Sequence, residues 1–245
     1  MTTEWLAAAY HFPSTYSCRV PMSSMNSALA MPAPGPATVR LALIRKGVEL
    51  FGLKTTREEV FPSVRAASIL ISPPERVTIS QQLLRSQKWE VDKQRKRERI
   101  QESLMLREVA HAQGCMTVFL HVRSAEEHQY QALLRAIGYW GQTDSLTSCL
   151  SVTRVEPDKA VCAVPLRTLG SNRPVQPFFS CLVTEFRDAH LRWEEVVPSQ
   201  KRAPAQALRL DVFVWPMVVV KHLGGGKLLV RSSLASTKGE ARESQ

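Results

Sequence analysis

The amino-acid sequence predicts a mixed α+β protein, and three observations support this class. Two segments carry apolar residues at helical spacing, and runs rich in β-branched and aromatic residues lie before and after each of them. Proline or glycine marks most boundaries between these segments. The 245 residues are 44% hydrophobic and 22% charged, which is typical of a folded globular chain. We therefore expect one large domain or two small ones with a sizeable core.

The first strand and the first helix are bounded by prolines and a glycine. We expect the strand over residues 4–12, where Pro13 ends it. The helix is expected over 36–51, because Pro36 suits a first turn in which its missing amide hydrogen is not needed. Gly52 follows as a helix terminator.

The next elements complete a known order. Strands are expected over 63–72 and 116–122, a helix over 125–137 with apolar residues at helical spacing, and a strand over 146–155. The order strand, helix, strand, strand, helix, strand is that of the ferredoxin-like (RRM-like) βαββαβ domain. Such a domain carries both helices on one face of an antiparallel sheet and leaves the other face open, as RNA-recognition modules do.

After residue 157 the pattern changes to short β-like runs separated by proline and glycine. The runs cover 160–166, 178–186, 208–222 and, after three glycines, 227–231. The predicted organisation is a ferredoxin-like RNA-binding domain (1–157) with a basic insertion (81–113), a β-rich C-terminal region (158–231) and a flexible tail (232–245).

The chain is strongly basic, with 32 Lys and Arg against 22 Asp and Glu, a net charge of +10. This surplus favours a polyanionic partner, either nucleic acid or an anionic membrane surface, over a basic protein without such a partner. No apolar run reaches the roughly 18–20 residues that span a bilayer, and no signal peptide is evident, so we expect no membrane partner.

The cysteines favour a reducing, cytoplasmic location. They are odd in number and widely spread, and no Cys-x-x-Cys pair occurs, which argues against a disulfide scaffold and a structural zinc site. We expect them to be small core residues, and we expect no metal and no cofactor. The five positions are Cys18, Cys115, Cys149, Cys162 and Cys181.

The insertion carries the strongest local charge. From Arg85 to Arg107, eight basic residues stand against four acidic ones, a surplus of +4. One interpretation is a basic arm that lies along a phosphate backbone. The other is a solvated helix face with i,i+4 ion pairs. The candidate RNA-binding residues of the arm are Lys93, Arg95, Lys96, Arg97 and Arg99.

Two further segments have features that suit a phosphate. In the turn Gly138-Tyr139-Trp140-Gly141, followed by Ser145, glycines allow a close backbone approach and the aromatic rings offer stacking surfaces. The alternative is a helix that ends at glycine and whose aromatic side chains fill the core. The second segment is the start of the first helix, where Thr38 lies near free amides and partial positive charge. Basic candidates near it are Arg19, Arg40, Arg45 and Lys46.

Catalytic signals are weak. No His-Glu-x-x-His or Gly-x-Ser-x-Gly motif occurs. A metal-independent ribonuclease uses a tyrosine, a lysine and a histidine as base, charge stabiliser and acid. The residues of these types are Tyr10, His11, Tyr16 and the Lys221-His222 pair, and the sequence does not show that they converge. We therefore expect no catalytic residue.

Several of these motifs together resemble the CRISPR-associated Cas-five family. They are the opening aromatic strand, Arg19-Val20-Pro21, the helix start Pro32-Ala33-Pro34-Gly35-Pro36-Ala37-Thr38, and the glycine turn with its following Ser145-Leu146. The resemblance covers roughly residues 4–155 and is strongest to members of type I-A and I-B complexes. The glycine turn departs from the family pattern, because the family usually has an Arg or Lys within it and this chain has Gln142, Thr143 and Asp144. This departure shifts the expected phosphate contacts toward the basic arm.

The resemblance implies a non-catalytic subunit of a type I Cascade effector complex. Such a subunit binds and caps the 5′ handle of the crRNA, contacts the large subunit and a backbone subunit, and meets target DNA only through the complex. The insertion at 81–113 would act as its thumb. Two alternatives stay open: a metal-independent endoribonuclease that processes CRISPR precursor RNA, and a generic RNA-binding protein with an RRM-like sheet.

Overall fold

The first sheet is antiparallel and has the strand order β3-β6-β1-β7. The computed structural model describes residues 3–23, 27–92, 97–169, 178–188, 190–196 and 207–233. The strands are β1 (Thr3–His11), β3 (Ile69–Ser72), β6 (Met116–Arg123) and β7 (Ser148–Arg154). The predicted α+β class with antiparallel sheets is therefore confirmed.

Two helices pack on one face of this sheet. Alternate residues of β1, including Leu6, Ala8 and Tyr10, are buried on that face. The helices are α1 (Pro36–Thr55) and α3 (Glu127–Ala136), and the Tyr10 hydroxyl donates a 2.8 Å hydrogen bond to the Leu134 carbonyl oxygen of α3. The opposite face is partly covered, because Ala7 and Phe119 pack against Cys162.

The segment between α1 and β3 differs from the prediction. α1 runs beyond Gly52, which has a φ of +81° inside it, and a π-helical turn (Thr56–Val60) leads to α2 (Phe61–Ala66). The strand expected over 63–72 therefore shortens to 69–72. Pro62 lies in the first turn of α2, and Val64 is buried against the core, so the first half of the predicted strand is helical.

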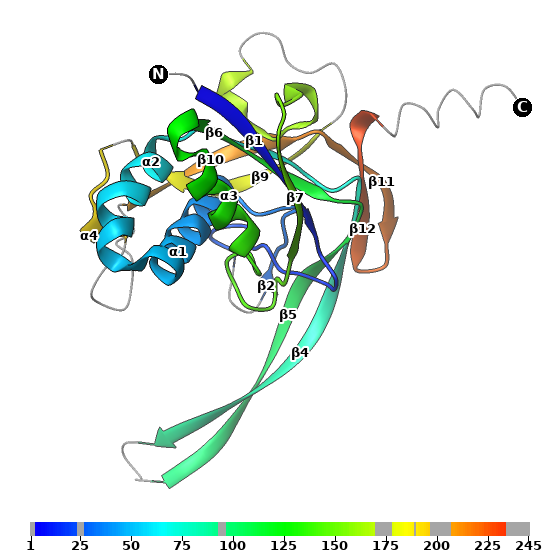
Figure 1. The fold of residues 1–245 in the computed structure, drawn as a ribbon. Coiled ribbons are helices and arrows are strands. Elements are labelled where there is room, and N and C mark those ends of the chain that lie inside the picture. Colours follow the sequence, from blue (N-terminus) through cyan, green and yellow to red (C-terminus); the bar gives the residue numbers. More distant parts are fainter. Residues whose placement is uncertain are drawn as a thin grey trace, which may run out of the picture.

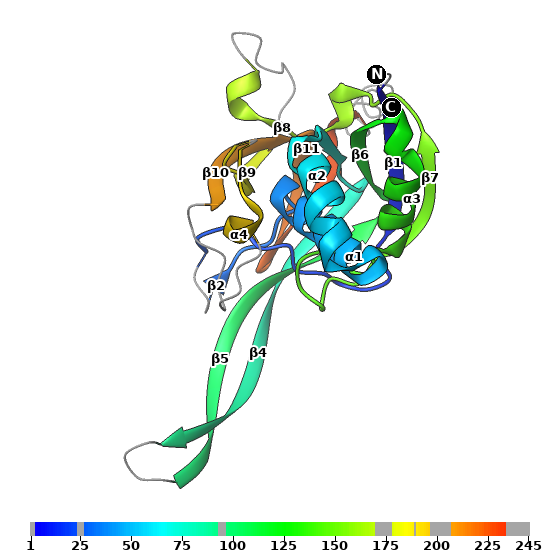
Figure 2. The same ribbon diagram turned by 60° about the vertical axis from the view of Figure 1, so that its left-hand side comes forward.

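The insertion is a long β-hairpin of β4 (Arg76–Asp92) and β5 (Arg97–Gln113). The strands pair continuously from Arg76↔Gln113 to Asp92↔Arg97. The solvated-helix interpretation of this stretch is therefore wrong. Figures 1 and 2 show the hairpin extending away from the rest of the molecule as a twisted ribbon.

The C-terminal strands join two different sheets. β8 (Val164–Pro165), β9 (Phe179–Phe186) and β10 (Leu208–Trp215) form a sheet of order β8-β10-β9. β11 (Met217–Leu223) and β12 (Gly226–Arg231) extend the base of the hairpin in the order β11-β12-β4-β5-β2, where β2 is Ser27–Ala28. The strand expected over 208–222 is divided at Pro216, which cannot donate to a sheet ladder.

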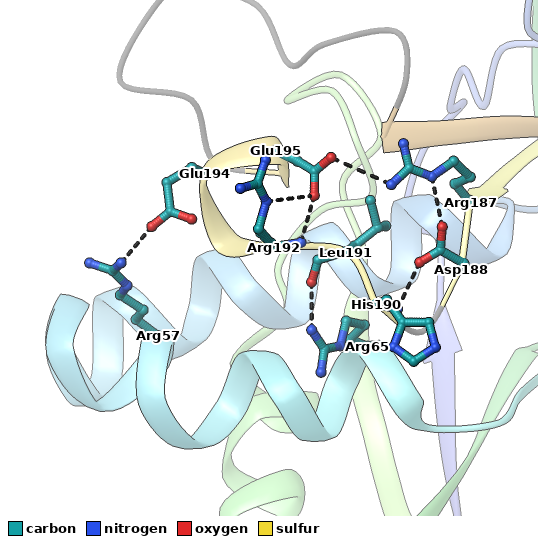
Figure 3. A network of polar contacts seen from close by, with 9 residues as sticks. All are labelled: Arg57, Arg65, Arg187, Asp188, His190, Leu191, Arg192, Glu194 and Glu195. Atoms are coloured by element: carbon teal, nitrogen blue, oxygen red, sulfur yellow. Dashed lines mark hydrogen bonds and ion pairs between the residues drawn. The ribbon is translucent and has the colours of Figure 1, made fainter.

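Polar contacts fix the chain after β9 to the helical layer. Figure 3 shows Arg57 and Arg65 pointing from that layer toward α4 (Trp193–Val196) and the residues before it. Arg65 Nη1 donates to the Leu191 carbonyl oxygen at 2.5 Å, and Arg57 Nη2 lies 2.5 Å from Glu194 Oε1. The ion pair of Arg57 is exposed, so it contributes little to stability.

Candidate nucleic-acid interface

A cavity of about 170 Å³ lies where three of the predicted motifs meet. The start of α1, the loop before it and the glycine turn each contribute to its wall. The lining residues are Ser17, Cys18, Arg19, Met31, Thr38, Trp140, Gly141 and Gln142. We call this space the α1 cavity. Because Arg19, Thr38 and the Trp140-Gly141 pair are far apart in the sequence, only the tertiary fold brings them together.

The helix start at the α1 cavity has no side-chain cap. Gly35 is the N-cap residue in an extended conformation, and Pro36 occupies the first turn. The amides of a first helical turn lack partners within the helix and carry partial positive charge. This end of α1 therefore suits an anion that approaches beside Thr38.

The glycine turn is held rigidly against this helix start. The Trp140 amide donates to the Ser145 carbonyl oxygen at 3.1 Å, and the Thr147 amide donates to the Gly138 carbonyl oxygen at 3.0 Å. Gly141 has a φ of +71°, in the left-handed region that favours glycine. A Cβ atom at Gly141 would lie 3.4 Å from Thr38 Cγ2, so the backbone of the turn passes close to α1.

Side chains connect the turn to the loop before α1. The Ser17 amide donates to Ser145 Oγ at 3.1 Å, and Arg19 Nη2 donates to Gln142 Oε1 at 3.1 Å. Gln142 is one of the residues that replace the basic residue expected in the turn. The structure thus places a guanidinium from another loop at the turn and orients it through Gln142.

Several buried donors at this site have no partner among the described residues. They are Trp140 Nε1, Arg19 Nε and Arg107 Nε, and only 1% of Trp140 is exposed. Burial lowers the pKa of Arg19, and the charge of Arg107 lowers it further, while Asp144 acts in the opposite direction. Buried Nε donors without partners and two positive charges that act on each other are unfavourable, and an anionic ligand would relieve both.

Arg45 and Lys46 lie outside the lining of the α1 cavity. The Arg45 guanidinium carbon is 3.6 Å from the centre of the Tyr139 ring, in a cation–π contact. Lys46 Nζ is 2.5 Å from Glu49 Oε2. The half-buried Tyr139 ring is therefore covered by Arg45 on one side.

Two of the predicted RNA-binding residues, Arg40 and Trp140, are buried in the core. Arg40 is only 8% exposed, lies 3.0 Å from Glu185 Oε1 through its Nε, and also donates to the Val64 carbonyl oxygen. Trp140 packs edge-on against Tyr10 with ring centres 4.9 Å apart. For Trp140, the core-filling alternative describes its ring, and only its Nε1 edge is left for a ligand.

The structure describes only part of the predicted basic arm. The backbone of Arg97 and Arg99 belongs to β5. Lys93, Arg95 and Lys96 lie outside the described residues.

Ser17 lines the α1 cavity and Arg107 acts on Arg19 through its charge, and neither was predicted from the sequence motifs. β5 carries Arg107 and pairs in parallel with β2, in the register Ala28↔Arg107. No local sequence signal predicts that register. Ser17 lies two residues from the predicted Arg19, so its position in the same loop was the available signal.

The residues considered for a ribonuclease are placed unfavourably. The Tyr10 and Tyr16 hydroxyls are buried and donate to the carbonyl oxygens of Leu134 and Pro32, at 2.8 and 2.6 Å. Burial raises the pKa of both tyrosines well above its ordinary value. Neither tyrosine is available as a general base, and Lys221 and His222 belong to β11 in another sheet.

Metal-binding clusters and membrane-spanning helices are both absent from the described residues. No group of three or more His, Cys, Asp or Glu side chains is placed to hold a metal ion among them. No helix in this part of the chain is long and apolar enough to cross a membrane.

Comparison with known proteins gives one sequence relative and several weak structural likenesses. No family model matches the chain. The chain is 28% identical over 178 residues to the CRISPR-associated protein Cas5 of Archaeoglobus fulgidus, a match that covers 71% of this chain and 76% of that protein. A crystal structure of a CRISPR protein from Archaeoglobus fulgidus gives a TM-score of 0.40 at 11% identity, covering 94% of this chain and 92% of that one.

A chain of a CRISPR RNA-guided surveillance complex gives a TM-score of 0.39 at 14% identity, covering 86% of this chain and 88% of that one. TM-scores this low do not establish a shared topology, and the sequence match stands without them. The resemblance that the motifs indicated is therefore confirmed: over most of its length this chain is similar to the CRISPR-associated protein Cas5.

Proposed function

We propose that the chain is a non-catalytic subunit of a type I CRISPR Cascade effector complex that binds and caps the 5′ handle of the crRNA. The observation that carries this proposal is the α1 cavity, where Arg19 Nε and Trp140 Nε1 are buried donors without partners among the described residues, beside a helix start that has no side-chain cap. The charge of Arg107 acts on Arg19 from outside the cavity lining. A phosphodiester supplies negative charge and several acceptor oxygens, which is what these donors require. The relationship to Cas5 supports the type of complex.

We also propose the finer fold and the division of the chain. The sheet is antiparallel with the order β3-β6-β1-β7, and along the chain α1 follows β1 and α3 follows β6. This arrangement supports a ferredoxin-like βαββαβ domain over 1–157. The region 158–231 would be the β-rich second part. Of the proposed tail 232–245, residues 234–245 lie outside the described part of the chain.

The hairpin of β4 and β5 is the proposed thumb. Its sequence from Arg85 to Arg107 carries a surplus of +4, and it extends beyond β11, β12 and β2, the other strands of the sheet at its base (Figure 1). A basic extension of this kind suits salt-dependent contacts with an RNA backbone. The proposed protein partners are the large subunit and a backbone subunit, target DNA is met through the complex, and the proposed location is the cytoplasm.

A binding experiment with the full chain tests this proposal. Arg19→Ala should weaken binding of a labelled repeat-derived handle RNA about tenfold or more, because a hydrogen bond to a charged group contributes roughly 1.5–3 kcal/mol. The slope of log affinity against log salt should fall by about 0.7 for each phosphate that the variant no longer neutralises. Fluorescence anisotropy at several salt concentrations measures both the affinity and the slope.

The matched control is Arg57→Ala, which removes the same charge from an exposed arginine paired with Glu194 on α4. This control should bind handle RNA like the parent chain. Equal affinity of Arg19→Ala and the parent chain would remove the α1 cavity from the RNA interface. Appearance of cleaved RNA in EDTA under single-turnover conditions would instead favour the endoribonuclease alternative.

A further inference from the structure

A second cavity lies beside the end of β6 and shares no lining residue with the α1 cavity. Its volume is about 430 Å³, within the range of roughly 300–1,000 Å³ that small-molecule sites occupy. α2 forms one wall, and the start of β1 and the end of β6 form another. We call it the β6 cavity. Its lining residues are Thr3, Pro62, Ser63, Ala66, Ala67, Ser68, His121, Val122, Arg123 and Glu126.

One lining residue of this cavity, His121, belongs to an aromatic pair. Trp5 on β1 stands directly opposite His121 on β6, and their ring centres are 4.8 Å apart with an interplanar angle of 32°. Because side chains alternate along a strand, both rings lie on the sheet face opposite the buried Leu6 and Leu120. His121 thus lines the cavity while Trp5 supports it from the neighbouring strand. Both side chains are partly exposed.

The rim of the β6 cavity is polar and electrically balanced. Arg123 forms an ion pair with Glu126, and Ser63 Oγ donates to Glu126 Oε2 at 2.7 Å. Burial opposes ionisation of Glu126, but the hydrogen bonds from Arg123 and Ser63 outweigh it and hold the pKa of this carboxyl below its ordinary value. The rim therefore offers a charged acceptor beside a charged donor without a net charge. This chemistry suits an uncharged ring with a hydrogen-bonding edge better than it suits a phosphate.

We propose that the β6 cavity binds one unpaired nucleobase of a single-stranded nucleic acid, stacked on the His121–Trp5 pair, with Arg123 and Glu126 at its hydrogen-bonding edge. Bases stack on aromatic side chains without strong sequence preference, and carboxylate and guanidinium groups pair with base edges. Arg123 and Glu126 belong to β6 and to the helical turn after it, so the platform and the edge contacts come from one rigid segment. The site is independent of the α1 cavity and does not require the handle.

Short labelled oligonucleotides and the full chain test this site. The probes are oligouridylate and oligodeoxythymidylate of about eight nucleotides, which is within the site sizes of single-strand binders. They are measured at raised salt, where backbone contacts weaken. His121→Ala should lower the affinity about 5- to 100-fold, because stacking contributes roughly 1–3 kcal/mol per base. His121→Phe should retain most of the affinity, and the two probes show whether the sugar matters.

A second variant guards against a folding defect. Ser68→Leu narrows the cavity from an exposed position between α2 and β3 and leaves both rings in place, so it should lower the affinity to a similar degree. The matched control is Thr153→Ala, an exposed position on the same sheet face opposite Ala7. It should bind both probes like the parent chain.

Photochemical crosslinking locates the base. A probe that carries 4-thiouridine should crosslink to peptides containing Trp5 or His121, as identified by mass spectrometry. Parent-like affinity of both His121→Ala and Ser68→Leu, or crosslinks that map only elsewhere, would overturn the proposal. The proposal would also be overturned if a partner subunit protected β6 and the 4-thiouridine probe formed no crosslink there. The cavity would then hold a side chain of that partner instead of a base. Arg19→Ala should leave binding of these probes unchanged, so failure here is distinct from failure of handle binding.

Discussion

The two cavities differ in how their arginines are neutralised. In the α1 cavity, Arg19 donates through Nη2 to the neutral amide of Gln142, its Nε has no partner among the described residues, and the charge of the nearby Arg107 acts on it. In the β6 cavity, Arg123 is paired with Glu126, and the aromatic pair supplies the wall. An unsatisfied cation requires an anion, whereas a satisfied one beside a ring favours a neutral, flat ligand. The same residue type therefore indicates different ligands according to what its neighbours leave unpaired.

The largest expected effect is on the free energy of unfolding. It distinguishes Arg40, a buried arginine near the start of α1, from Arg19. Arg40 is buried against Glu185 with an Nε–Oε1 distance of 3.0 Å. Arg40→Ala leaves the carboxylate of Glu185 without its partner, which should lower the free energy of unfolding by about 3–5 kcal/mol. Urea denaturation followed by circular dichroism measures this decrease.

The double variant Arg40→Met with Glu185→Leu should recover most of this stability, since a buried ion pair replaced by apolar groups of similar volume is often neutral. Arg19→Ala should be far milder, because Arg19 donates to the neutral amide of Gln142 rather than to a buried carboxylate. If Arg40→Ala unfolds like the parent chain, the distinction between a core arginine and a ligand arginine fails.

The contrast between Arg40 and Arg19 also shows what the sequence could predict. Both are basic residues near the start of the same helix, and the sequence placed them in one candidate set. Whether each meets a carboxylate depends on β9 and on the register of β5, which are distant in the chain. Local patterns therefore predicted charge near α1 but not which charge remains free.

Regular periodicity explains which elements could be predicted. The observed bounds of β1, β6, β7, α1 and α3 lie close to the expected ones. α3 has apolar residues at clear helical spacing, whereas α1 was marked by the proline at its start. In the hairpin, alternation of period two places Leu83, Trp89 and Ile100 on one face, but the dense charges between them obscured it. The two strands pair over 17 residues each, and this pairing satisfies the backbone hydrogen-bonding groups of the hairpin along its length. The insertion is therefore β structure rather than a helix.

A smaller effect tests whether the glycine turn shapes the α1 cavity. Gly141→Ala places a side chain at a φ of +71° and at 3.4 Å from Thr38 Cγ2, so it should cost about 1–2 kcal/mol of stability. The same change should weaken handle RNA binding, because alanine disfavours this φ and the turn beside Thr38 then shifts to relieve the strain. Thermal denaturation and anisotropy measure the two effects on one preparation.

The matched control for the turn is Gly138→Ala. A Cβ atom at Gly138 would meet no atom within 4 Å, and its φ is not in the left-handed region. This variant should retain RNA affinity and most of its stability. Equal RNA affinity of Gly141→Ala and Gly138→Ala would mean that the close approach of the turn to Thr38 is not part of the site.

The smallest expected effect is the pH dependence of stability that comes from Glu126, the carboxylate that neutralises Arg123 at the β6 cavity. Because the folded state holds the pKa of Glu126 below its ordinary value of 4.5, this carboxylate stabilises the fold above that pH. Its contribution should fall as the pH drops below 4.5 through the lowered folded-state pKa. Glu126→Gln should therefore lower stability at neutral pH by less than about 1 kcal/mol, as expected for a partly exposed ion pair, and the difference from the parent chain should vanish in acid. Melting temperatures of both proteins between neutral and acidic pH measure this convergence. A difference that stays constant over that range would mean that Glu126 is not held ionised by Arg123 and Ser63, and the rim of the cavity would then lack its charged acceptor.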